Sequence, residues 1–72
     1  MKTKKILIVG KQGVGKTQLA NMISKNLNIP VIDGISGLVE LTNEEGVYTS
    51  NSISVGVARI GLPQGFVLIH IS

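Results

Sequence analysis

One short segment, residues 10–17, constrains this chain more than any other. Its sequence, GKQGVGKT, has the spacing G-x-x-x-x-G-K-[ST] at every specified position. Residues 6–9 directly before it form an uninterrupted, mostly β-branched apolar run, which is typical of a strand buried on both faces. Directly after it, apolar residues recur at helical spacing from about residue 15 to 27. The order strand, glycine-rich loop, helix predicts a helix N-terminus whose unpaired backbone N–H groups adjoin the loop.

The residue types of this segment suit a phosphate chain. Gly10, Gly13 and Gly15 give the backbone conformations that other residues avoid, so the amides of residues 13–17 can converge on phosphate oxygens. Lys16 adds a positive charge for the terminal phosphates, and Thr17 offers a hydroxyl to Mg²⁺. The alternative is a flexible surface loop without a ligand, which would leave the spacing unexplained. We therefore expect a nucleotide-binding site made of Gly10, Lys11, Gln12, Gly13, Val14, Gly15, Lys16 and Thr17.

Length and composition narrow the possibilities further. The 72 residues allow one small domain, residues 1–72, with a limited core and, in the absence of cysteine, no disulfide. A bound ligand or a partner subunit is therefore expected to contribute to stability. No apolar run approaches the ~20 residues that cross a bilayer. A nucleotide-binding loop suits the cytoplasm, so we expect a cytoplasmic protein that has no membrane partner.

Positive charge is concentrated near the start of the chain. The formal net charge is +3, and five of the seven basic residues lie within the first sixteen positions. This asymmetry favours polyphosphate ligands. Alternatively, Lys2, Lys4 and Lys5 form a solvated terminus that keeps an edge strand soluble. With one Tyr and one Phe the chain has no aromatic platform for stacking bases, which argues against nucleic acid as the main partner.

A second strand is predicted soon after the helix. Pro30 ends the helix, and residues 31–34 (VIDG) predict a short strand that ends in a turn and that the helical crossover would make parallel to the first strand. Through its loop motif and the stretch IPVIDG at 29–34, the segment 1–34 resembles the N-terminal part of P-loop NTPases, most closely small-molecule and nucleotide kinases. In those kinases an aspartate at this strand end helps organise the acceptor substrate or magnesium, and the resemblance assigns that role to Asp33. A plain Asp-Gly turn is the alternative interpretation.

The second half of the chain has a different pattern. Short apolar runs at 38–42, 47–50, 53–58 and 66–71 predict up to four short strands that could pair as antiparallel hairpins, with turns at 43–46 and 62–65. Ile53, Val55 and Val57 would share one strand face. No second helix is predicted. The expected fold is therefore α/β, with parallel strands 5–9 and 30–33 around a helix 15–28, followed by a β-rich segment 35–72.

The resemblance also indicates what this sequence lacks. A complete P-loop domain has a strand ending in an acid that holds magnesium, whereas the last strand here carries His70 in that place. His70 is either a general base or a terminal histidine without a catalytic role. Glu40 is the best acidic substitute among the glutamates, although Glu40, Glu44 and Glu45 are most simply solvent-facing. The triplet TSN at 49–51 is similar to the polar sensor at a strand end in AAA-type ATPases, but it precedes the last strand.

Two functional hypotheses follow. The first is binding of a nucleoside triphosphate, ATP in preference to GTP, with Mg²⁺ as cofactor and weak hydrolysis or phosphoryl transfer at most. Lys16 and Asp33 would be catalytic, and Thr17 and Asp33 would hold the metal. The second is a small regulatory or interaction module on a shortened, catalytically incomplete P-loop fold. Its β-rich half has few charged residues to protect the strand edges, and it would bind a protein partner or a second copy of the chain.

Overall fold

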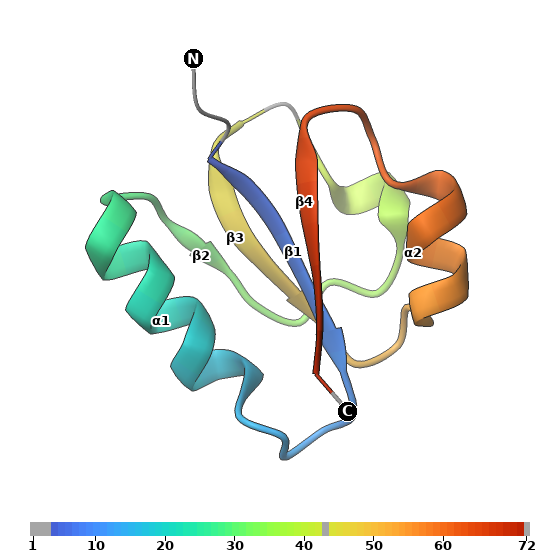
Figure 1. The fold of residues 1–72 in the computed structure, drawn as a ribbon, viewed down its shortest axis with the longest axis horizontal. Coiled ribbons are helices and arrows are strands. Elements are labelled where there is room, and N and C mark those ends of the chain that lie inside the picture. Colours follow the sequence, from blue (N-terminus) through green and yellow to red (C-terminus); the bar gives the residue numbers. More distant parts are fainter. Residues whose placement is uncertain (1–3, 43, 72) are drawn as a thin grey trace.

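A four-stranded sheet in which all strands are parallel organises the fold (Figure 1). The computed structural model describes residues 4–42 and 44–71. Its elements in chain order are β1 (Lys5–Gly10), α1 (Lys16–Leu27), β2 (Val31–Ile32), the 3₁₀ turn η1 (Leu38–Glu40), β3 (Gly46–Ser50), α2 (Val55–Gly61) and β4 (Phe66–Ile71). The strand order is β2-β3-β1-β4, so β1 is hydrogen-bonded to β3 on one side and to β4 on the other.

The first half of the chain has the predicted elements. Residues 6–9 of β1 are buried, with exposed fractions of at most 7%. Helix α1 starts after Gly15 and ends before Asn28, which adopts a left-handed conformation with φ of 58° and donates its N–H to the Ser24 carbonyl. The helix thus ends through its own C-cap before it reaches Pro30. The predicted strand 30–33 is shortened to β2, and β3 lies between it and β1.

The prediction of a β-rich, antiparallel second half is wrong. That half contains only the strands β3 and β4 among its described residues, and both are parallel to β1. Residues 38–42 contain η1, and the predicted strand 53–58 instead forms the start of α2. The physical reason is the sheet order. Because β3 and β4 flank β1 and run parallel, the chain between them must cross one face of β1, and parallel strands need such a crossover.

Local features of α2 agree with this crossover. The Ser54 hydroxyl accepts the N–H of Val57 at 3.2 Å and caps the helix start. Val55, Ala58 and Leu62 have helical spacing and pack toward the sheet. The predicted turn 62–65 is confirmed, since the N–H of Phe66 reaches the Pro63 carbonyl at 3.3 Å. In the predicted turn 43–46, Asn43 lies outside the described residues and Gly46 already belongs to β3.

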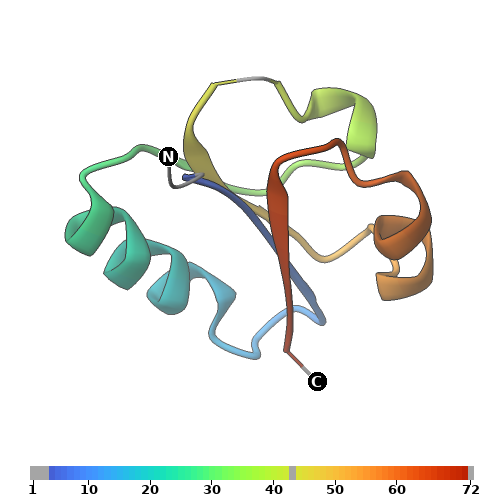
Figure 2. The same ribbon diagram turned by 45° about the horizontal axis from the view of Figure 1, so that its top comes forward.

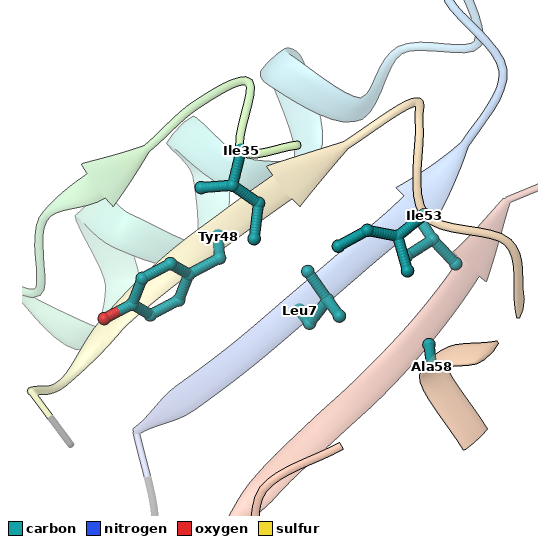
Figure 3. Packing of buried hydrophobic residues seen from close by; sticks show 6 residues of the cluster. Leu7, Ile35, Tyr48, Ile53 and Ala58 are labelled. Atoms are coloured by element: carbon teal, nitrogen blue, oxygen red, sulfur yellow. The ribbon is translucent and has the colours of Figure 1, made fainter. Parts of the chain in front are cut away.

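Each face of the sheet carries its own apolar cluster, because side chains alternate along a strand. Ile6 and Ile8 pack with Ala20 of α1. On the opposite face, Leu7 packs with Ala58 of α2 in the cluster of Figure 3, whose members are Leu7, Val9, Ile35, Tyr48, Ile53 and Ala58. Figures 1 and 2 accordingly show α1 on one side of the sheet and α2 on the other.

This arrangement creates a crevice at one edge of the sheet. The chain leaves the carboxyl end of β1 toward α1, and it leaves the carboxyl end of the neighbouring strand β3 toward α2 on the opposite face. Ligands of open α/β sheets bind at such a reversal, where adjacent connections diverge. Within the part of the chain that the structure describes, neither helix has the length and apolar character needed to cross a membrane.

Candidate functional site

The diverging connections border an open cavity of about 490 Å³. The loop after β1 and the start of α1 form one wall, and the residues that follow β2 and β3 form the other. In Figure 1 the loop after β1 and the segments that follow β2 and β3 lie at the lower end of the sheet, to which the strands point. Its lining residues are Gln12, Gly13, Gly15, Lys16, Thr17, Gln18, Asp33, Gly34, Thr49, Ser50 and Asn51.

The glycines of the loop have two different structural roles. Gly13 and Gly15 have φ of 86° and 91°, a region that favours glycine. Gly10 is required for space instead, because a Cβ there would lie 2.5 Å from the backbone oxygen of Ile71 in β4. The sequence interpretation treated all three glycines as conformational, and this holds in the structure for Gly13 and Gly15 only.

The loop presents a row of backbone donors. The first backbone bond of α1 runs from the Leu19 N–H to the Gly15 carbonyl at 3.1 Å. Residues 12 and 13 form a turn, and among the described residues no acceptor pairs with the N–H groups of residues 15–18. Several of these residues line the cavity, so the wall formed by the loop can bind an anion through its backbone.

Lys16 is the positive charge of this wall. Its residue is only 9% exposed, and its ammonium group donates to the Lys11 carbonyl at 2.7 Å. The side chain therefore lies back over the start of the loop, and among the described residues this carbonyl is the single acceptor of its three ammonium protons. A ligand oxygen in the cavity could be bound by these donors or could replace the Lys11 carbonyl.

Thr17 and Asp33 come from opposite walls and line the same cavity. Both residues are exposed. The carboxylate atom Oδ1 of Asp33 accepts a hydrogen bond from the Thr49 hydroxyl. Gly34 has φ of 75°, but residues 33–36 form neither a turn nor a bend, so the predicted Asp-Gly turn is not present. Asp33 is the carboxylate of the cavity.

The end of β3 supplies buried hydroxyl groups to the crevice. Thr49 and Ser50 are each 1% exposed. The Ser50 hydroxyl accepts the N–H groups of Ser52 and Ile53, both at 3.1 Å, and so holds the chain as it turns toward α2. Ser50 is therefore occupied in shaping the loop, whereas Thr49 bonds across to the segment after β2.

The remaining candidates lie elsewhere. His70 lines a second cavity of about 380 Å³ beside α2, together with Gly10 and Lys11 of the loop, and this cavity shares only Asn51 with the first. Val14 lines neither cavity. His70 is thereby separated from Asp33, so the two do not form one acid–base pair in this arrangement.

Glu40 is occupied in its own loop. Its carboxylate accepts the hydroxyl and the N–H of Ser36, both at 2.7 Å, and the N–H of Gly37 at 3.1 Å. These hydrogen bonds, that of the Ser36 hydroxyl foremost, hold the pKa of Glu40 below its ordinary value of 4.5. Glu40 lines neither cavity, and Glu44 and Glu45 are exposed and line neither as well.

Sequence reasoning missed the contributions of Gln18 and Gly34 to the first cavity, and it noted the end of β3 only through the similarity of the triplet 49–51 to a polar sensor. A usable signal existed in the polar triplet 49–51 directly after an apolar run, because the carboxyl ends of parallel strands meet at one edge. The prediction of antiparallel pairing hid that signal. No family model matches the chain, and comparison with curated proteins and with solved structures finds no match either.

Proposed function

We propose that the chain binds the triphosphate of a nucleotide, with Mg²⁺, in the 490 Å³ cavity, and that residues 1–34 are a P-loop unit. One observation carries the proposal. A loop with free backbone donors and a lysine lies at the carboxyl end of β1, where the connections of β1 and β3 diverge. Anion-binding loops and the general ligand position of α/β sheets coincide there. The family resemblance described above supports the same ligand.

The positions of the loop residues suit successive parts of the phosphate chain. Gly13 and Gly15 hold the backbone so that consecutive amides can turn toward one anion. Lys16 would exchange the Lys11 carbonyl for a phosphate oxygen, which keeps its ammonium hydrogen-bonded throughout. The exchange replaces a neutral acceptor with a charged one, and this difference favours the bound state.

The possible metal ligands of the cavity suit Mg²⁺ that is bound together with a phosphate chain, and they do not suit a metal ion held by protein side chains alone. Among the described residues, no group of three or more His, Cys, Asp or Glu could hold a metal ion. Thr17 and Asp33 nevertheless bring a hydroxyl and a carboxylate to the cavity. Mg²⁺ prefers such oxygens and is typically bound by one or two protein groups plus substrate phosphates. When bound, it would neutralise phosphate charge.

Turnover is expected to be weak. Phosphoryl transfer needs a positioned nucleophile and a group that accepts its proton. The end of β3 carries Thr49 and Ser50, whose hydroxyl groups are already hydrogen-bonded. This leaves Asp33 as the single carboxylate of the cavity, with Lys16 to stabilise phosphate charge. We therefore assign ATP binding, in preference to GTP, with slow hydrolysis or transfer at most, in a nucleotide-containing compartment such as the cytoplasm.

Nucleotide titration followed by thermal unfolding and by calorimetry tests the proposal. Ligand at 100 times its Kd stabilises the folded state by about 2.7 kcal/mol. For a domain of this size each kcal/mol raises the Tm by about 4–8 °C. The proposal is contradicted if ATP, GTP and their diphosphates all leave the Tm unchanged at millimolar concentration.

Lys16→Ala supplies the matched test of the site. Loss of a charge-assisted hydrogen bond of about 1.5–3 kcal/mol weakens binding by about 10–150-fold. Lys25→Ala is the control, because Lys25 lies exposed in the last turn of the same helix and lines neither cavity. Equal effects of the two substitutions would remove the special role of Lys16.

A second candidate is an interaction module that uses β4. This strand is at the edge of the sheet and carries no charged Asp, Glu, Lys or Arg. Val67 on it is 46% exposed, and Ile60 of α2 is 90% exposed. Uncovered edge strands of this kind pair with other chains. Phosphate release distinguishes the candidates: measurable nucleotide binding without release favours the regulatory module, and release that survives Lys16→Ala indicates a contaminating enzyme.

A further inference from the structure

Thr49 is the most densely bonded polar residue of the crevice. It is 1% exposed, and its hydroxyl accepts the N–H of Gly34 at 3.1 Å while donating to Oδ1 of Asp33. Its backbone carbonyl accepts the N–H of Ile35 at 2.9 Å. Three consecutive residues that follow β2 are therefore held against the end of β3 by one threonine.

The donor and acceptor roles in these hydrogen bonds determine which oxygen of the Asp33 carboxylate is occupied. A hydroxyl has one proton, and the N–H of Gly34 can only donate, so the proton of Thr49 must point to Asp33. This bond occupies Oδ1. The second oxygen, Oδ2, has no protein donor among the described residues, although Asp33 lines the cavity that also contains Thr17.

The strand order explains why the bond can form. β3 lies between β1 and β2, so a side chain at the end of β3 adjoins the connections of both neighbours. Thr49 lies two residues after Val47, which packs on the α1 side of the sheet, so Thr49 lies on that side too. The loop after β1 leaves toward α1 on the same side. Thr49 thus stands beside the wall that carries Thr17.

We propose that Thr49 is a positioning residue that holds the carboxylate of Asp33, with Oδ2 free, toward a divalent cation bound together with the triphosphate. The inference rests on the proposed function. Metal-binding carboxylates are commonly oriented by such hydrogen bonds, and removal of the orienting partner typically lowers metal affinity about 10–100-fold. A threonine that served the fold alone would affect stability and not the metal dependence of ligand binding.

The decisive quantity is the ratio of ATP affinity with Mg²⁺ to ATP affinity in EDTA, measured by calorimetry. Thr49→Val keeps the shape of the side chain and removes the hydroxyl, and it is expected to lower this ratio about 10–100-fold. Its Kd in EDTA should stay within about twofold of the wild type, because residues 13–17 remain intact. Thr49→Ser retains the hydroxyl and should restore most of the ratio. The same series with inorganic tripolyphosphate should behave alike.

A second experiment does not require the buried substitution Thr49→Val to leave the protein stable. Asp33→Asn changes an exposed residue and should lower the ratio by itself, and Thr49→Val should add nothing in that background. In the nucleotide-free protein, the Hα–Hβ couplings of Asp33 should indicate one rotamer in the wild type and in Thr49→Ser, and averaging in Thr49→Val.

The outcomes separate this inference from the proposed function. A Thr49→Val protein that weakens binding equally with Mg²⁺ and with EDTA, or that keeps the wild-type ratio, overturns the role of Thr49 and leaves nucleotide binding intact. An Asp33→Asn protein with the wild-type ratio also overturns it. A wild-type protein that binds neither ATP nor tripolyphosphate under either condition overturns the proposed function together with this inference.

Discussion

Gly10→Ala tests the contact between the start of the loop and β4. A Cβ at this position would lie 2.5 Å from the Ile71 carbonyl oxygen and 3.2 Å from Cγ2 of Val14. An ordinary carbon–oxygen contact is about 3.3 Å, so one of the two strands must move by roughly 0.8 Å. The obstacle is backbone, which cannot rotate away as a side chain could. Overpacking of this kind costs about 1–3 kcal/mol.

This cost is large for so small a chain. At about 0.05–0.15 kcal/mol per residue, 72 residues have a stability of about 4–11 kcal/mol. Urea unfolding followed by circular dichroism, in buffer without nucleotide, measures the difference directly. We expect a lower urea midpoint and a Tm reduced by about 5–20 °C.

Gly56→Ala is the matched control for this experiment. Gly56 lies exposed in α2, and a Cβ there would meet no atom within 4 Å. Alanine favours the helix over glycine by about 0.5–1 kcal/mol, so this variant should be slightly more stable than the wild type. If Gly10→Ala unfolds within about 0.5 kcal/mol of the wild type, the parallel pairing of β4 beside β1 is not as described.

Three further predictions concern the second half of the chain. Because the bonds from Ser36 lower the pKa of Glu40 below 4.5, its ionised form contributes stability that is complete above pH 4.5 and is lost as the pH falls through the lower folded pKa. Glu40→Gln should flatten this part of the stability profile in urea titrations between pH 7 and about pH 3, and a profile identical to the wild type would refute it. Ser54→Ala removes the cap of α2 and should cost about 0.5–2 kcal/mol in the same assay, whereas a strand at 53–58 would predict little change. Tyr48→Phe removes a buried hydroxyl that donates to the Glu44 carbonyl at 3.1 Å and is hydrogen-bonded to the Thr42 hydroxyl at 2.9 Å; we expect a loss of about 1 kcal/mol, and no loss if both bonds are absent in solution.

The first half of the fold could be predicted because its signals are local and agree with one another. An apolar run, a glycine motif and a helical period each define their own segment, and the structure has β1 and α1 there. The second half could not, because Val55, Val57 and Ile60 are β-branched residues inside a helix. Their strand propensity was overridden by the need to cross from β3 to β4, which is a property of the whole sheet. Only the Ser54 cap indicated the helix locally.

The candidate site divides in the same way. The loop that contributes Lys16 and Thr17 is specified by one continuous motif, whereas the opposite wall depends on which strand lies next to β1. The sequence interpretation assumed that the last strand would carry the acid and therefore examined His70. In the structure β3 also adjoins β1, and its end carries Thr49, which is bonded to a carboxylate from the next strand outward.

The carboxylate of this candidate site can therefore come from the segment after β2, which is not adjacent to β1, because β3 between them ends in a residue that hydrogen-bonds to it. A threonine hydroxyl suits this position because it accepts from one side and donates to the other. A carboxylate at position 49 would occupy the same place but would meet the charge of Asp33 at hydrogen-bond distance, and two adjacent carboxylates cannot both ionise readily. Thr49→Asp should therefore raise the pKa of one member of the new pair, which NMR titration of the carboxyl groups would reveal. If Thr49→Asp instead leaves both carboxyl groups with ordinary pKa values, positions 49 and 33 are not in contact in solution, and the bridge between β2 and β3 does not exist.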